Sequence, residues 1–89
     1  MRTLNEAIDT IKQELTLKGN MYGKTYLKVA QAMSVPPQHS ILVRMFEKMF
    51  RVKWMIDNGM KDSKAIASEF KEIAAYAILA MFESEVDDG

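Results

Sequence analysis

Three cationic residues recur at helical spacing in the middle of this chain and could bind an anion. Arg44, Lys48 and Arg51 fall within about 60° of one another on a helical wheel. Such side chains donate charge-assisted hydrogen bonds to phosphate oxygens. Apolar residues border this row of cations on both sides of the predicted helix. The helix is therefore expected to be packed on most of its circumference, with the cations facing a cleft or an interface. The alternative is a solvated face on which Glu47 pairs with Arg44 or Arg51, worth about 0.3–0.5 kcal/mol.

Two acidic residues and a tyrosine form a complementary set further along the chain. Glu69 and Tyr76 share one predicted helical face with apolar residues, and Glu72 lies at its edge. A buried carboxylate without a partner is very costly, so the three cations are its expected partners. Two interpretations stay open at this point. The charges form an interhelical ion-pair network that fixes helix register, or the same network orients the cations toward a phosphate while Tyr22 or Tyr76 stacks on a base.

Several other chemistries are excluded or disfavoured by the residues present. The chain has no cysteine and one histidine, which excludes thiolate chemistry and any site that needs two imidazoles. Gly19 and Gly23 with Lys24 lack the spacing of a phosphate-binding loop. A magnesium site needs several convergent carboxylates, and the segment expected to face Glu69 and Glu72 offers one acid among bases. No cofactor is therefore expected.

Length and charge limit the partners. A chain of 89 residues makes one domain, spanning 1–89, and buries only about 60–65% of its unfolded surface, so a homo-oligomer is expected. The 12 basic and 12 acidic residues cancel, which disfavours general nucleic-acid binding. The N-terminus lacks the pattern of a signal peptide, and no apolar run approaches the ~20 residues of a membrane span. We expect no membrane partner and a cytoplasmic location.

Hydrophobic periodicity and breaker residues predict four helices. Thr3 and Glu6 fit a capping box for a helix over 4–18, which Gly19 ends. Two glycines and an asparagine predict a shaped loop over 18–23, followed by a short helix over 24–33 that stops before Pro36.

The second half of the sequence predicts a helical hairpin. A third helix begins between 37 and 40 and runs to Asp57, where Asn58 and Gly59 end it. Asp62 or Ser63 caps a fourth helix that continues to about Glu83. The predicted fold is all-α, a small four-helix bundle built from α-hairpins, with an ordered core over 4–83 and a frayed acidic tail over 84–89.

Three short motifs occur in an order and spacing that resemble a known family, over residues 15 to 82 or so. They are Lys18-x-x-x-Tyr22-Gly23, Arg44-x-x-x-Lys48-x-x-Arg51, and Asp62 followed by Glu69-x-x-Glu72-Ile73-Ala74-x-Tyr76-Ala77. Together they resemble the nucleotide-modification-associated domain 1 family of phages and bacteria, which is distantly similar to all-α nucleoside triphosphate pyrophosphohydrolases of the MazG type. The chain departs from the family at Glu72, where an aspartate is usual. It also lacks the first Glu-x-x-Glu pair of the pyrophosphohydrolases.

The resemblance implies an all-α domain from phage genomes, often encoded near nucleotide metabolism. Our first hypothesis is a phage-encoded protein that binds a nucleotide or a nucleotide-derived signalling molecule in the host cytoplasm. Small size, the phage-like family and the missing catalytic groups favour sequestration of this molecule to counter host defence. The residues expected to bind the ligand are Lys18, Tyr22, Arg44, Lys48, Arg51, Glu69, Glu72 and Tyr76. Without that first acidic pair, binding is favoured over catalysis. The alternative is a divergent nucleotide pyrophosphohydrolase, with magnesium as its metal, or an accessory protein of nucleotide modification. A purely structural interaction domain is the third possibility.

Overall fold

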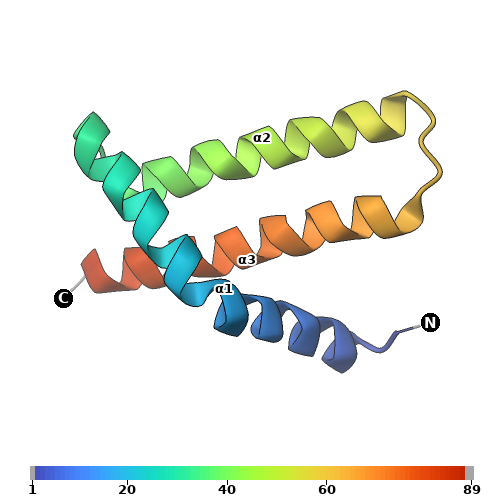
Figure 1. The fold of residues 1–89 in the computed structure, drawn as a ribbon, viewed down its shortest axis with the longest axis horizontal. Helices are drawn as coiled ribbons and strands as arrows, with labels where there is room; N and C mark the ends of the chain where they lie inside the picture. The colour runs from blue at the N-terminus through green and yellow to red at the C-terminus, as the bar shows by residue number, and fades with distance from the viewer. Residues whose placement is uncertain (1, 88–89) are drawn as a thin grey trace.

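The chain folds into helices joined by short connections. The computed structural model describes the backbone of residues 2–87 and the side chains of 2–16 and 27–85. Over this part of the chain the elements are α1 (Leu4–Met33), α2 (Pro37–Asp57) and α3 (Ser63–Asp87), with no strand. Helices α2 and α3 lie side by side and antiparallel, while α1 lies across them (Figure 1). The predicted all-α class is confirmed.

Both ends of α1 follow signals in the sequence. The Thr3 hydroxyl oxygen accepts a hydrogen bond from the Glu6 backbone N–H at 3.2 Å and donates to Glu6 Oε1 at 3.1 Å, so the predicted cap is confirmed. After Met33, Ser34 takes the left-handed conformation with φ 55°, and its N–H donates to the Gln31 carbonyl at 3.2 Å. Pro36 then prevents the helix from continuing.

The turn between α2 and α3 also has the predicted residues at its two key positions. Gly59 has φ 69°, a left-handed conformation that glycine adopts without steric cost. Asp62 Oδ1 accepts a hydrogen bond from the Ala65 N–H at 3.1 Å and so caps α3. Of the two predicted caps, Asp62 is the one used.

Replacing Gly59 with alanine is expected to lower the free energy of unfolding by about 1 kcal/mol, because an L-residue is disfavoured at positive φ. No atom lies within 4 Å of the added Cβ, so the backbone conformation is the main cause of the loss. Ser34→Gly removes the same strain at φ 55° and should act in the opposite direction. Urea denaturation measures both changes. Unchanged stability in Gly59→Ala would contradict the left-handed turn.

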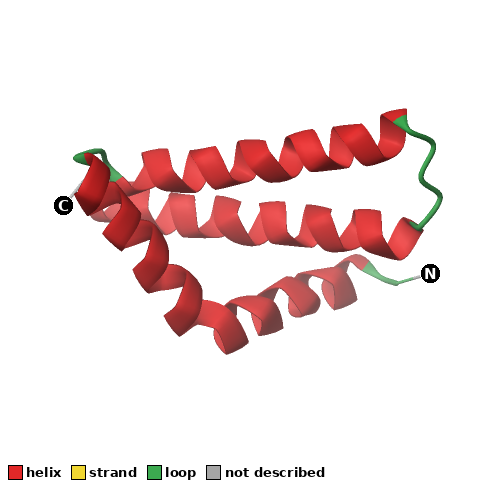
Figure 2. Cartoon of the chain, turned by 45° about the horizontal axis from the view of Figure 1, so that its top comes forward, coloured by secondary structure: helices red, strands yellow, loops and turns green. Residues whose placement is uncertain are grey.

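The two helices predicted for the first third of the chain are instead two arms of one helix. The sequence predicted a loop over 18–23, whereas helical backbone runs through this segment in α1. The helix changes direction near the middle of its length (Figure 2). Gly19 and Gly23 each cost a helix about 1 kcal/mol relative to alanine, but neither removes a backbone N–H as proline would. Two glycines therefore weaken the helix without ending it, and the described elements number three.

Helix α3 extends further than predicted. The sequence analysis ended it near Glu83 and left 84–89 as a frayed tail, but α3 continues to Asp87. The Ser84 hydroxyl donates a hydrogen bond to the Ala80 carbonyl at 2.8 Å within the helix. Neither glycine nor proline occurs between Glu83 and Asp87, so no residue there ends the helix.

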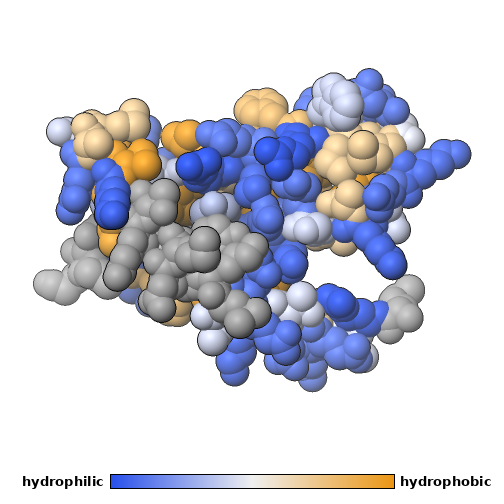
Figure 3. All heavy atoms as spheres, viewed as in Figure 1, coloured by the Kyte–Doolittle hydropathy of each residue, from blue (hydrophilic) through white to orange (hydrophobic). Residues whose placement is uncertain are grey.

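The core within one chain is small. Among the residues whose side chains the structure describes, the buried apolar ones are Ala30, Ile41, Val52, Met55 and Ala75, and Ile41 has no exposed surface. Most of the tertiary contact lies between α2 and α3, and α1 contacts each of them less. Figure 3 shows hydrophobic residues that reach the surface along α2, at the top of the view. In the described residues, no helix combines the length and the apolar character that crossing a membrane requires.

Candidate functional site

The predicted cations of α2 meet the predicted acids of α3 along one edge of the helix pair. Lys48 Nζ forms an ion pair with Glu72 Oε2 and lies 3.8 Å from Glu69 Oε2. Arg51 Nη1 donates a hydrogen bond to Glu69 Oε1 at 3.1 Å. These ion pairs link the two antiparallel helices and so fix the register of α2 against α3. Four of the predicted site residues are thus in direct contact.

Lys48 is the most enclosed cation of this cluster. Its side chain is 17% exposed and lies between two carboxylates. Glu69 Oε2 is buried and accepts no hydrogen bond, so the nearby positive charge of Lys48 compensates it. Lys48 therefore holds α2 against α3, and its charge is used within the fold.

Arg44 and Arg51 are more accessible. The side chain of Arg51 is 59% exposed, and that of Arg44 is half exposed and pairs with Glu47 on its own helix at 3.7 Å. A guanidinium carries five N–H donors, of which the Glu69 bond uses one in Arg51. Seven residues apart, the two arginines are separated by about 10.5 Å along the same side of the helix. Both keep donors for a ligand.

The charges of the cluster balance. Its three predicted cations are each paired with an acid, and the acids are Glu47, Glu69 and Glu72. A balanced cluster has little long-range attraction for anions. A ligand would have to be held by direct hydrogen bonds from the arginines.

A hollow of about 240 Å³ opens beside Arg44, where the end of α1 meets the start of α2. Its lining residues are Val29, Met33, His39, Ser40, Val43, Arg44 and Glu47. Ser40 Oγ is buried without a hydrogen-bond partner. The sequence analysis did not select Ser40, because a serine in the first turn of a helix is ordinary. Arg44 thus borders a space that also has an unsatisfied hydroxyl in its wall.

The other predicted site residues are less closely tied to the cluster. Tyr76 is half-buried and lies on α3 one turn after Glu72, on the same side of the helix. Lys18 and Tyr22 belong to α1, but their side chains lie outside the described residues. The roles expected for Lys18, Tyr22 and Tyr76 stay predictions.

An ion pair between α1 and α3 was not predicted from the sequence. Lys71 Nζ lies 3.5 Å from Glu14 Oε2, and both side chains are largely buried. The pair joins the N-terminal half of α1 to α3. The sequence does contain a sign of this ion pair. Glu14 lies on the same helical face as the apolar residues Ile11 and Leu15, where a carboxylate needs a partner.

The acidic residues do not fit a magnesium site. The described residues contain no group of three or more metal-binding side chains placed to hold a metal ion. Glu69 and Glu72, which the hydrolase alternative requires as ligands, instead pair with Arg51 and Lys48. Magnesium would have to displace ammonium and guanidinium groups from these carboxylates.

No family model, curated protein or solved structure matches this chain. The resemblance to the nucleotide-modification-associated family therefore stays an expectation that depends on three motifs. The function has to be argued from the contacts in the cluster.

Proposed function

We propose that this protein binds a small phosphate-bearing molecule of the nucleotide class, without turnover, on the side of α2 that presents Arg44 and Arg51. The observation that supports this most directly is the pair of accessible guanidinium groups, two helical turns apart, each anchored to one carboxylate. Arginine suits this role because its planar group can donate two parallel hydrogen bonds to one phosphate.

The ion pairs around Lys48 support binding by holding Arg51 in place. Lys48 fixes the position of Glu69, and Glu69 in turn accepts the hydrogen bond from Arg51. A side chain that is already oriented loses less conformational entropy when a ligand binds. The interhelical network and the ligand site are then two roles of the same contacts.

The hollow beside Arg44 supplies room for part of a ligand. Its 240 Å³ is smaller than the roughly 300–1,000 Å³ of pockets that enclose a whole small molecule. A nucleotide would therefore place one part in the hollow, near Arg44 and Ser40, and extend along α2 toward Arg51. Binding without turnover suits the sequestering role expected from the chain's small size, the phage-like family and the missing catalytic groups.

Replacing Arg51 with glutamine is expected to weaken ADP binding about tenfold or more, because a hydrogen bond between charged groups is worth about 1.5–3 kcal/mol. Isothermal titration calorimetry of the full chain with ADP, ATP and inorganic pyrophosphate measures this change. Native mass spectrometry of the gently purified protein shows separately whether a nucleotide is retained.

Lys53→Gln is the matched control. Lys53 is an exposed cation on the same helix, but it pairs with Asp57 and lies about 160° around the helix from Arg51. The Lys53→Gln substitution should change ADP affinity by no more than about twofold, because a distant exposed charge has a weak effect. Equal losses in both variants would indicate general charge attraction. Hydrolysis products, or no binding of any of the three compounds by the unaltered protein, would contradict the proposal.

A further inference from the structure

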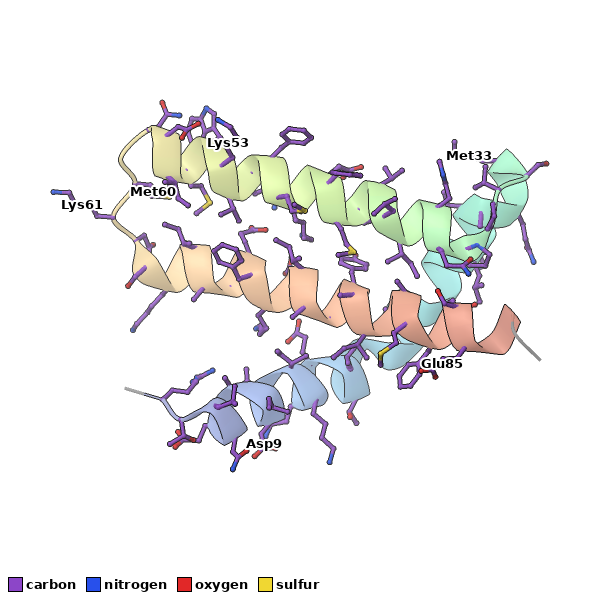
Figure 4. All side chains as sticks on the ribbon, turned by 180° about the vertical axis from the view of Figure 1, so that it is seen from behind. Asp9, Met33, Lys53, Met60, Lys61 and Glu85 are labelled. Carbon is purple, nitrogen blue, oxygen red and sulfur yellow. The ribbon has the colours of Figure 1, made fainter. Side chains whose placement is uncertain are left out.

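Helix α2 has a wide apolar face that the described residues of the chain leave largely exposed. We name as the outer apolar face the exposed side chains of Leu42, Phe46, Met49, Phe50, Trp54 and Ile56. They span about 160° of the helix circumference, beside the buried side that contacts α3. Phe50 is 67% exposed, and its ring lies 6.5 Å from that of Phe46. Figure 4 shows side chains on α2 that project away from α3.

The surface area of the single chain is large for its mass. It exposes 6702 Å² at 10.2 kDa, whereas a folded monomer of this mass exposes about 5,300 Å². The excess of about 1,400 Å² is more than the roughly 800 Å² that each partner buries in a standard interface. The radius of gyration, 14.4 Å, also exceeds the roughly 12 Å expected for 89 residues. The excess exposed surface is therefore large enough for an interface of standard size.

The charges on the outer apolar face favour a second, identical copy of the chain as its binding partner. A face that meets itself must carry no net charge, or the two copies repel each other. The cation within the outer apolar face, Lys53, is neutralised by Asp57 on the same helix. The whole chain has formal net charge +0, so no long-range repulsion opposes self-association.

The spacing along α2 favours a helix as the partner surface. Leu42, Phe46, Met49 and Ile56 follow the three- and four-residue steps of a helix-packing seam, with Lys53 at the intervening position. The middle of this seam lies at Met49. Two antiparallel copies of α2 that cross there would bury the same residues on each side.

We propose that a second copy of this chain covers the outer apolar face, with the two α2 helices antiparallel about a two-fold axis near Met49. This inference does not depend on the proposed ligand, because the arginine side of α2 lies away from the seam.

Phe50→Glu tests the interface. Sedimentation velocity at about 50 μM is expected to show a dimer for the unaltered chain and a monomer for the variant, with the dimer dissociation constant raised at least about 100-fold by the buried charge. Leu4→Glu is the matched control, since Leu4 is an exposed apolar residue on α1 and the variant should stay dimeric. A monomeric unaltered chain, or a dimeric Phe50→Glu, would overturn the proposal.

Disulfide trapping locates the axis. The chain has no cysteine, so Met49→Cys introduces a single thiol that lies near its own copy across the axis. This variant should form a covalent dimer under mild oxidation, whereas Asn5→Cys on α1 should do so much more slowly. Equal rates would overturn the assignment of the face. ADP titration of Phe50→Glu separates this proposal from the ligand site, because loss of the dimer need not remove binding.

Discussion

Replacing Lys48 with methionine is expected to lower the free energy of unfolding by about 3 kcal/mol, the magnitude seen when one partner of a largely buried ion pair is removed. The variant keeps a side chain of similar length and leaves Glu69 and Glu72 without their shared cation. Both carboxylates are mostly enclosed, and Arg51 contacts only Glu69. Urea denaturation at one fixed protein concentration measures the loss, because self-association makes stability depend on concentration.

Two controls separate the loss of charge from the loss of packing. Arg44→Met removes a cation from an exposed pair on the same helix, away from the outer apolar face, and should cost about 0.5 kcal/mol or less. Adding Glu69→Gln and Glu72→Gln to Lys48→Met should recover most of the lost stability, since the uncompensated charges are removed. If the triple variant were as unstable as Lys48→Met alone, packing rather than charge would be the main contribution of Lys48.

The ion pairs of Lys48 and Arg51 with Glu69 were predictable because they follow from the sequence pattern of each helix. An acid at the position of Glu69, in the middle of an apolar helical stripe, requires a cation from the facing helix. Lys48 and Arg51 are the cations at matching spacing, and the structure places both against Glu69. Helix ends followed local signals too, as Thr3 and Asp62 show.

The course of α1 could not be predicted from local rules. Gly19 and Gly23 disfavour a helix by about 1 kcal/mol each, but most of the stability of a helix in a protein comes from tertiary packing. The sequence pattern therefore shows that this segment is weak, but it does not decide between a loop and a bent helix. The structure has the bent helix (Figure 2).

The packing of α2 was predicted only in part. Its apolar residues on both sides of the cations indicated a helix packed on most of its circumference. Within one chain, α2 buries the side of Ile41, Val52 and Met55 and leaves Phe46 and Phe50 exposed. Hydrophobic periodicity shows which residues need a neighbour, but it does not show whether that neighbour belongs to the same chain. The exposed face is thus consistent with the homo-oligomer expected from the chain's small size.

Replacing Ile41 with alanine is expected to lower the free energy of unfolding by about 3 kcal/mol, within the range measured for buried isoleucine truncations. Ile41 is 0% exposed, and its removal leaves a cavity in a core that has few other buried side chains. A domain of this size is stabilised by only about 4–13 kcal/mol in total, so the loss is a large fraction of it. Urea denaturation measures the change, and a loss below about 1 kcal/mol would contradict the burial of Ile41.

Truncation of Ile8 and Ile56 to alanine provides a reference for the stability loss of Ile41→Ala. The same two variants also test the proposed dimer. Ile8 and Ile56 are 50% and 55% exposed in the single chain, so truncation to alanine should cost each about 1 kcal/mol if the chain is monomeric. A second copy on the outer apolar face would bury Ile56 and leave Ile8 as it is. Ile56→Ala should then cost about 1 kcal/mol more than Ile8→Ala, and the difference should shrink as the protein is diluted below the dimer dissociation constant. Equal losses at all concentrations would place Ile56 outside the interface.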